Sequence, residues 1–220
     1  MMAKQNPSTQ SATDRLLQAF ADNAPPDWPV ARAAILAGAP VDAPIPSWSG
    51  ATPLFIAATC GCTTEVGWLI DHGATLEVRN SNGETALVQA VRWCRTTTVA
   101  LLLARGADPN ARDQDGWTVL MAVGSIRSES AKNLIAALLD HGANPSATTP
   151  DGHTAPEILM EIAGPMLTGY LDEALAGDRH TIGRRRLLDK LTAAQRAAWF
   201  PRSCAAEAAA AVRTAWHRTP

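Results

Sequence analysis

A repeating ladder of glycines constrains this chain more than any other feature of its sequence. The first series has spacings of 33, 33 and 36 residues and consists of Gly50, Gly83, Gly116 and Gly152. The second has spacings of 35, 33 and 36 residues and consists of Gly38, Gly73, Gly106 and Gly142. Because two independent markers share one period, the sequence predicts a protein built from stacked structural repeats.

The residues around the glycines explain what each repeat would form. A threonine lies two residues after each glycine of the first series, at Thr52, Thr85, Thr118 and Thr154. Each threonine precedes a helical apolar pattern, so we expect its hydroxyl to cap a helix. The second series follows the apolar end of a helix, where a left-handed residue is favoured. Small residues keep the first helix of each repeat thin: Ala57, Ala58, Ala90 and Ala122. The predicted helix pairs would expose apolar faces on both sides, which only stacking buries.

These segments resemble the ankyrin repeat, whose pattern is a turn glycine, Thr-Pro-Leu-His, two short helices and Gly-Ala-Asp. The matching stretches include Gly50-Ala51-Thr52-Pro53-Leu54 and Leu102-Leu103-Ala104-Arg105-Gly106-Ala107-Asp108. The resemblance implies a bacterial-type protein of about five repeats. Its expected fold is an all-α ankyrin-repeat solenoid with β-turn fingers, plus a C-terminal helical extension. We expect a flexible segment at 1–10, repeats at about 11–45, 46–79, 80–112, 113–148 and 149–177, and a basic extension at 178–220.

The chain departs from the family pattern at the histidine that follows Thr-Pro-Leu. Phe55, Val88 and Met121 stand in its place. Since these side chains cannot donate the hydrogen bonds of that histidine, we expect cohesion between repeats to depend more on packing. Pro40, Pro44 and Pro46 predict a stiff loop rather than a helix before the central repeats.

Charge is distributed unevenly along the 220 residues, although the formal net charge is only −2. Residues 1–175 carry 10 Lys and Arg against 18 Asp and Glu, whereas residues 176–220 carry nine against three. The strongest basic cluster is Arg184-Arg185-Arg186. An acidic body with a basic tail indicates two functional zones. Three interpretations of the tail stay open: docking on the acidic repeats, contact with a partner protein, and nucleic-acid binding.

No catalytic constellation stands out in the sequence, and we expect neither an enzyme nor a cofactor or metal site. The four cysteines lack the spacing of a zinc site or of a disulfide framework. His72 and His141 lie at equivalent positions beside helix C-termini, which favours a structural role. The aspartates of the turns recur at repeat spacing and are expected to initiate turns: Asp108, Asp113, Asp115 and Asp151.

Tryptophan is unusually frequent, with seven Trp against three Phe and one Tyr. Trp48, Trp93 and Trp117 fall at positions that, in the ankyrin family, bear partner-contacting residues of the concave and finger surface. The resemblance therefore implies a partner-binding set: Trp48, Arg79, Glu84, Arg92, Trp93, Arg112, Gln114, Asp115 and Trp117. The alternative is that these indoles pack on adjacent fingers or on the tail. Trp28 and Trp68 are expected to pack between helices.

The hypothesis that follows is a non-catalytic protein–protein interaction module that binds a folded partner. The resemblance suggests an inhibitory role, as in an immunity protein or a regulator of a toxin or enzyme. Alternatives are an effector or adaptor acting on host proteins, and a nucleic-acid-associated regulator. No apolar run approaches the ~20 residues needed to span a bilayer, and residues 1–10 are polar. We therefore expect a cytoplasmic monomer. The 42 alanines, and 16 arginines against three lysines, favour a bacterial source with a GC-rich genome.

Overall fold

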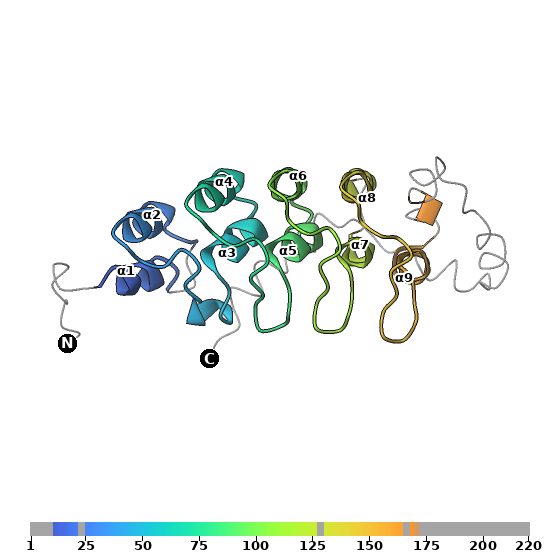
Figure 1. Ribbon diagram of the computed structural model, residues 1–220, viewed down its shortest axis with the longest axis horizontal. Coiled ribbons are helices and arrows are strands. Elements are labelled where there is room, and N and C mark those ends of the chain that lie inside the picture. The colour runs from blue at the N-terminus through green and yellow to red at the C-terminus, as the bar shows by residue number, and fades with distance from the viewer. Residues whose placement is uncertain (1–10, 22–24, 127–129, 165–167, 170, 172–220) are drawn as a thin grey trace.

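The computed structural model describes residues 11–21, 25–126, 130–164, 168–169 and 171, and every structural statement below concerns these residues. Helices alternate between two layers, which Figure 1 shows as an upper row of α2, α4, α6 and α8 above α1, α3, α5, α7 and α9. The elements are α1 (Ala12–Ala19), α2 (Trp28–Leu36), η1 (Pro46–Trp48), α3 (Pro53–Cys60), α4 (Thr63–Asp71), α5 (Ala86–Arg92), α6 (Thr96–Ala104), α7 (Val119–Ala122), η2 (Val123–Ser125), α8 (Ser130–Asp140) and α9 (Ala155–Ala163).

The predicted fold class is confirmed as an all-α solenoid of stacked helix pairs. The described residues contain four complete pairs, followed by α9. They hold three isolated antiparallel bridges, each at the base of a finger, and no longer strand: Ile45–Ala51, Arg112–Thr118 and Thr148–Thr154. The second helix of a fifth pair stays a prediction. The N-terminal segment 1–10 and the basic extension 178–220 lie outside the described residues.

The helix ends follow from the residues that mark the period. Gly73, Gly106 and Gly142 all have φ +89°, the left-handed conformation that closes a helix without the steric cost of a Cβ. Thr52 and Thr118 accept hydrogen bonds through their hydroxyls from the backbone N–H of the third helical residue, at 3.3 and 3.4 Å. At Thr154, Glu157 completes the turn by accepting from the threonine N–H at 2.8 Å.

The prediction that the Thr85 hydroxyl caps a helix is wrong. Its backbone has the extended N-cap conformation (φ −90°, ψ 167°), but its buried hydroxyl makes no hydrogen bond. The loop expectation at Pro46 is also wrong, because this proline begins the short 3-10 helix η1. Its fixed φ suits the first turn of a helix, where a missing N–H costs nothing.

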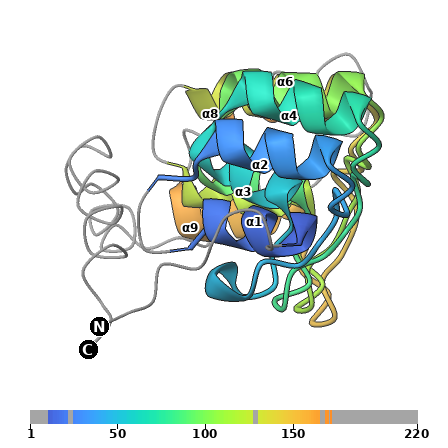
Figure 2. The same ribbon diagram turned by 90° about the vertical axis from the view of Figure 1, so that its left-hand side faces the viewer.

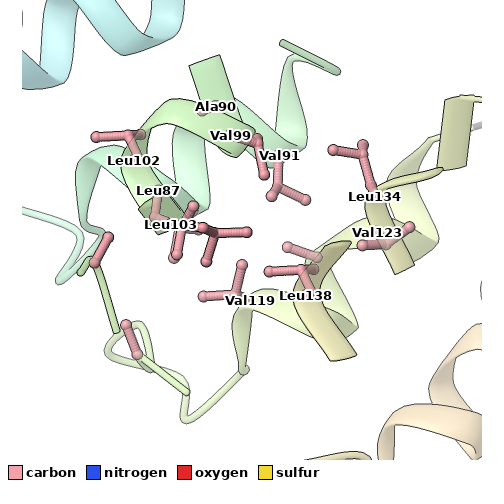
Figure 3. Packing of buried hydrophobic residues seen from close by; sticks show 14 of the residues in the cluster. Leu87, Ala90, Val91, Val99, Leu102, Leu103, Val119, Val123, Leu134 and Leu138 are labelled. Atoms are coloured by element: carbon pink, nitrogen blue, oxygen red, sulfur yellow. The ribbon is translucent and has the colours of Figure 1, made fainter. Parts of the chain in front are cut away.

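Two hydrophobic clusters fill the space between the layers. The N-terminal cluster gathers Leu16, Phe20 and Ile56 where α1, α2 and α3 meet, and the larger cluster runs from Leu54 to Leu171. Figure 3 shows how side chains of neighbouring repeats share this second core, for example Leu87, Val91, Leu102, Leu134 and Leu138. Each fully buried leucine contributes about 1.5–3 kcal/mol, and those that contact the next repeat stabilise the stack.

Small side chains in the inner helices let the backbones of neighbouring repeats approach each other closely. Ala57, Ala58 and Ala90 are completely buried, and Ala122 is nearly so. Phe55, Val88 and Met121, which replace the family histidine, are also buried. They add packing area, as the sequence predicts.

Neighbouring fingers approach each other as closely as the inner helices do. A Cβ on Gly116 would lie 2.6 Å from the Cδ of Pro150 in the next finger. The turn glycines thus provide both a left-handed turn and room for the adjacent repeat.

Candidate protein-binding surface

Four fingers and the exposed residues of the inner helices form one continuous side of the solenoid, which we call the finger surface. The fingers comprise residues 45–51, 79–85, 112–118 and 148–154. Figure 2 looks along the stack and shows the loops superposed on the same edge. Because the repeats have a fixed period, equivalent positions lie in columns across this surface. The residue before the capping threonine, for example, is Ala51, Glu84, Trp117 and His153 in successive repeats.

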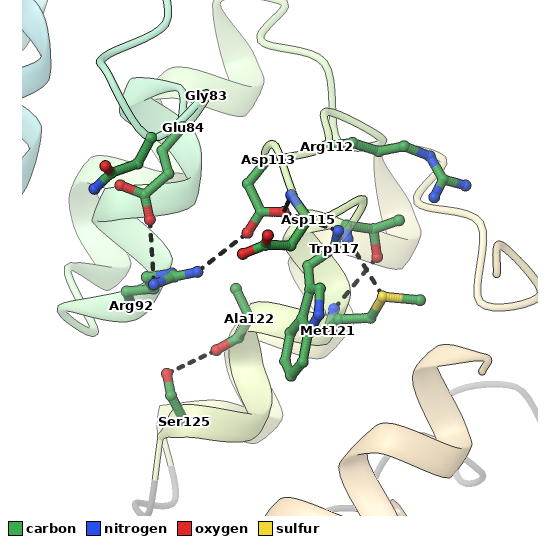
Figure 4. A network of polar contacts seen from close by, with 12 residues as sticks. Gly83, Glu84, Arg92, Arg112, Asp113, Asp115, Trp117, Met121, Ala122 and Ser125 are labelled. Atoms are coloured by element: carbon green, nitrogen blue, oxygen red, sulfur yellow. Dashed lines mark hydrogen bonds and ion pairs between the residues drawn. The ribbon is translucent and has the colours of Figure 1, made fainter. Parts of the chain in front are cut away.

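Arg92 lies at the centre of the polar contacts on this surface (Figure 4). Its Nη1 is 3.1 Å from Oε1 of Glu84, and its Nη2 is 3.2 Å from Oδ2 of Asp113 in the next finger. Both carboxylate side chains are only 5% exposed, whereas the arginine side chain is 40% exposed. Two buried anions therefore hold one exposed cation in a single orientation.

Glu84 is itself fixed by neighbouring amides. Its Oε2 accepts from Nδ2 of Asn80 at 3.1 Å and from Nε2 of Gln89 at 2.7 Å. The same Gln89 accepts from the indole Nε1 of Trp93 at 3.0 Å. A connected network thus runs from the indole through Gln89 and Glu84 to Arg92. Since the Glu84 side chain is only 5% exposed, it holds Arg92 in place and presents little surface of its own to solvent.

The three tryptophans singled out in the sequence are half-buried. Trp117 packs against the main hydrophobic cluster, and Figure 4 shows its ring extending from the finger toward α7. Its backbone N–H also donates to Oδ1 of Asp113 at 2.9 Å. Trp48 packs against the N-terminal cluster. Each indole therefore has part of its surface in the fold and part available to solvent, and contact with a partner stays a prediction.

Arg79, which is exposed, and Arg112, which is half-buried, both bind backbone carbonyls of the fingers through their guanidinium groups. Arg112 Nη1 donates to the carbonyl of Gly116 at 2.8 Å in its own finger and to that of Thr148 at 2.7 Å in the next. Arg79 repeats the pattern one step earlier, donating to the carbonyls of Gly83 and Arg112. These two arginines tie three consecutive fingers together. Cohesion between repeats therefore has a polar component that the sequence analysis missed.

Gln114 and Asp115 lie at the tip of the third finger, and both are exposed. The backbone N–H of Gln114 reaches the carbonyl of Asn82 in the preceding finger at 3.4 Å. Asp113, beneath them, accepts from the backbone N–H groups of Asp115 and Trp117, so its expected role in forming the turn is confirmed. The tip is thus rigidly supported while its two side chains face solvent.

Asn80, Gln89 and Asp113 also belong to the site, although they are not in the set expected from the sequence. Alignment by the 33-residue period is the signal that finds them. Asn80 and Asp113 share one finger position, while Gln89 lies one helical turn before Arg92 on the same side of α5.

Other expected structural residues lie where the repeat pattern placed them. Nδ1 of His72 is 2.8 Å from the carbonyl oxygen of Trp68, and Nδ1 of His141 is 2.8 Å from that of Ala137. Trp68 stacks on His72 with ring centroids 3.8 Å apart, and Arg32 lies over the Trp68 ring. Trp68 is therefore an inter-repeat packing residue on the outer layer, as expected.

Among the described residues, no three His, Cys, Asp or Glu gather to hold a metal ion. Cys60 is the one described residue with a clearly shifted pKa. Burial, followed by the neighbouring Cys62, raises its thiol pKa to about 11, which makes it a poor nucleophile. No helix in the described ranges has the length and apolar character needed to cross a membrane.

A family model described as Ankyrin repeats, in three copies, matches residues 27–113. The matched region covers helices α2 to α6 and two complete fingers, so it includes Glu84, Arg92 and Trp93. Together with the helix pairs and finger loops, it shows that the solenoid is an ankyrin-repeat solenoid. Ankyrin repeats are protein–protein interaction modules and are not catalytic as a family. A search of curated proteins finds no match to the chain.

Proposed function

We propose that the chain binds a folded partner protein through the finger surface. Arg92, Trp93 and Trp117 form the centre of the proposed site, with Gln114 and Asp115 at the neighbouring finger tip. Trp48 extends it toward the N-terminal edge. The observation that carries this proposal is Arg92, which is 40% exposed although both of its carboxylate partners are buried.

The orientation of Arg92 is what makes it suited to recognition. A free arginine loses rotamer freedom when a partner immobilises it, which costs about 0.5–1.5 kcal/mol. Glu84 and Asp113 have already imposed that order in the unbound protein, so less affinity is lost on binding. Arginine and tryptophan are also the residue types that most often dominate binding energy at interfaces.

The proposed site differs from the set expected from sequence in the roles of three residues. Arg79 and Arg112 support the fingers through backbone carbonyls, and Glu84 supports Arg92. Within this function, we propose inhibition of a toxin or enzyme in the bacterial cytoplasm as the biological role, by analogy with the family. Occupying the partner with a rigid surface of several repeats is a direct way to block it.

Affinity purification from the native host would identify the partner, and calorimetry would then test the surface. Arg92→Ala, Trp93→Ala and Trp117→Ala are each expected to weaken binding by about thirtyfold, or about 2 kcal/mol. Trp68→Ala is the matched control, because it removes an indole from the outer layer and should lower stability rather than affinity. Normal binding by all three finger-surface variants would overturn the proposal.

A further inference from the structure

The described part of the molecule is acidic, with 14 Asp and Glu against eight Lys and Arg. On the outer layer the acids are partly neutralised, since Glu65 pairs with Arg32 and Asp71 with Arg105. The finger surface of the last two repeats is different. From Arg112 onward, the last two fingers and α9 carry Asp113, Asp115, Asp151, Glu157 and Glu161 against one arginine.

Three of these acids face solvent, and we refer to Asp115, Asp151 and Glu161 as the acidic trio. None of them forms an ion pair with a described residue. Asp115 and Asp151 occupy equivalent finger positions 36 residues apart, so they belong to adjacent repeats. The two described arginines nearby are already engaged, Arg112 by backbone carbonyls and Arg92 by Glu84 and Asp113. Among the described residues, the negative charge of the acidic trio is therefore uncompensated.

The chain supplies the complementary charge immediately afterwards. Residues 178–220 carry nine Lys and Arg against three Asp and Glu, beginning with the triplet Arg184-Arg185-Arg186. The last described residue, Leu171, is buried in the same hydrophobic cluster as α9. Arg184 follows it by 13 positions in the chain, a reach of up to about 45 Å. Since packed helices lie about 8–10 Å apart, this connection spans the last repeats easily.

We propose that the basic segment 178–220 is an intramolecular ligand of the acidic trio. Individual exposed ion pairs are weak, but a tethered segment acts at an effective concentration in the millimolar range. A contact with a dissociation constant of about 1 mM is then half occupied. Docking at this end would place the segment beside Trp117, Gln114 and Asp115. The docked segment would therefore compete with a partner for the finger surface. This competition rests on the proposed function, whereas the docking itself is independent of it.

Carbodiimide cross-linking of the full-length protein tests the docking without any partner. Lys190 is the one lysine after residue 171, so the amides it forms with carboxylates report directly on where the segment lies. Peptide mapping by mass spectrometry at low salt should recover Lys190 linked to the acidic trio. Because the Debye length falls from about 10 Å at 0.1 M salt to about 3 Å at 1 M, these links should drop at least fivefold in 1 M salt.

Matched variants separate docking from chance encounters. Replacing the triplet by glutamine, R184Q/R185Q/R186Q, should lower the Lys190 links at least fivefold. Asp115→Asn should also lower the link to Asp151, whose own carboxylate is unchanged, whereas Asp140→Asn on the outer layer should not. Links spread equally over outer-layer acids, or insensitive to salt, would overturn the proposal.

Mixing isotopically light and heavy protein shows whether the links form within one chain. Links confined to one isotope support the intramolecular ligand, and mixed-isotope links overturn it in favour of self-association. Because no partner is present in any of these measurements, their failure is independent of the calorimetric test of the finger surface.

Discussion

Removing the guanidinium of Arg112 should destabilise the solenoid, and the structure sets the size of the effect. Arg112 Nη1 donates to the carbonyls of Gly116 and Thr148 at 2.8 and 2.7 Å. Hydrogen bonds that involve a charged group contribute about 1.5–3 kcal/mol when buried. Because the arginine is half-buried and water can reach the fingers, we expect Arg112→Ala to cost about 2 kcal/mol in total.

Thermal and urea unfolding, followed by circular dichroism, would measure this loss. For a chain of this length, 2 kcal/mol corresponds to a fall in Tm of about 4–8 °C. Arg105→Ala is the matched control, because it also removes an arginine but breaks only an exposed ion pair with Asp71, at 2.7 Å. Surface pairs of this kind contribute about 0–1 kcal/mol, so its Tm should fall by less than about 4 °C.

The result also decides between two roles for Arg112. If Arg112→Ala melts with the wild type and instead loses partner binding, the finger tie contributes nothing and the arginine is a contact residue. If stability falls and the remaining folded protein binds normally, Arg112 is a support for the fingers. A change in the urea m-value would show that one end of the solenoid unfolds separately, as repeat proteins permit.

Three further predictions follow from buried or crowded groups. Glu84→Ala should cost about 1–3 kcal/mol in urea unfolding, because it leaves Arg92 and two amide donors without their acceptor. Gly116→Ala should destabilise by about 1 kcal/mol more than Gly50→Ala in thermal melts, because both have positive φ but only the first clashes with the next finger. Cys60 should react with iodoacetamide at pH 8 about 100-fold more slowly than an ordinary thiol, because its pKa of about 11 leaves little thiolate.

Each of these has a contradicting outcome. Equal stabilities of Glu84→Ala and wild type would mean that the polar network is not maintained in solution. Equal melts for the two glycine variants would mean that the fingers separate freely. The raised pKa of Cys60 also makes the stability of the fold depend on pH. The contribution of this thiol to the free energy of unfolding is complete below about pH 9 and is lost as the pH rises toward 11, because the thiol ionises first in the unfolded chain. Labelling that is fast at pH 8 would show Cys60 to be accessible as thiolate.

The sequence alone determined the architecture of this protein. Helix starts, helix ends and apolar faces are short-range features, and the 33-residue period repeats them often enough to outweigh single departures. Repeats contact only their neighbours, so the stacking order follows the chain order. For this reason the glycines at 73, 106 and 142 and the thin alanine-rich inner layer were all predictable from residues close in sequence.

Tertiary structure alone decided the role of each polar residue on the finger surface. Glu84 and Trp117 occupy the same repeat position, yet one is buried beneath Arg92 and the other is half-exposed. Arg112 falls where the family places contact residues, but its acceptor at Thr148 lies 36 residues further along the chain. Whether a charged side chain is satisfied within the fold or left for a partner depends on its rotamer and on groups one repeat away. A local sequence pattern contains neither, because both are set only when neighbouring repeats pack.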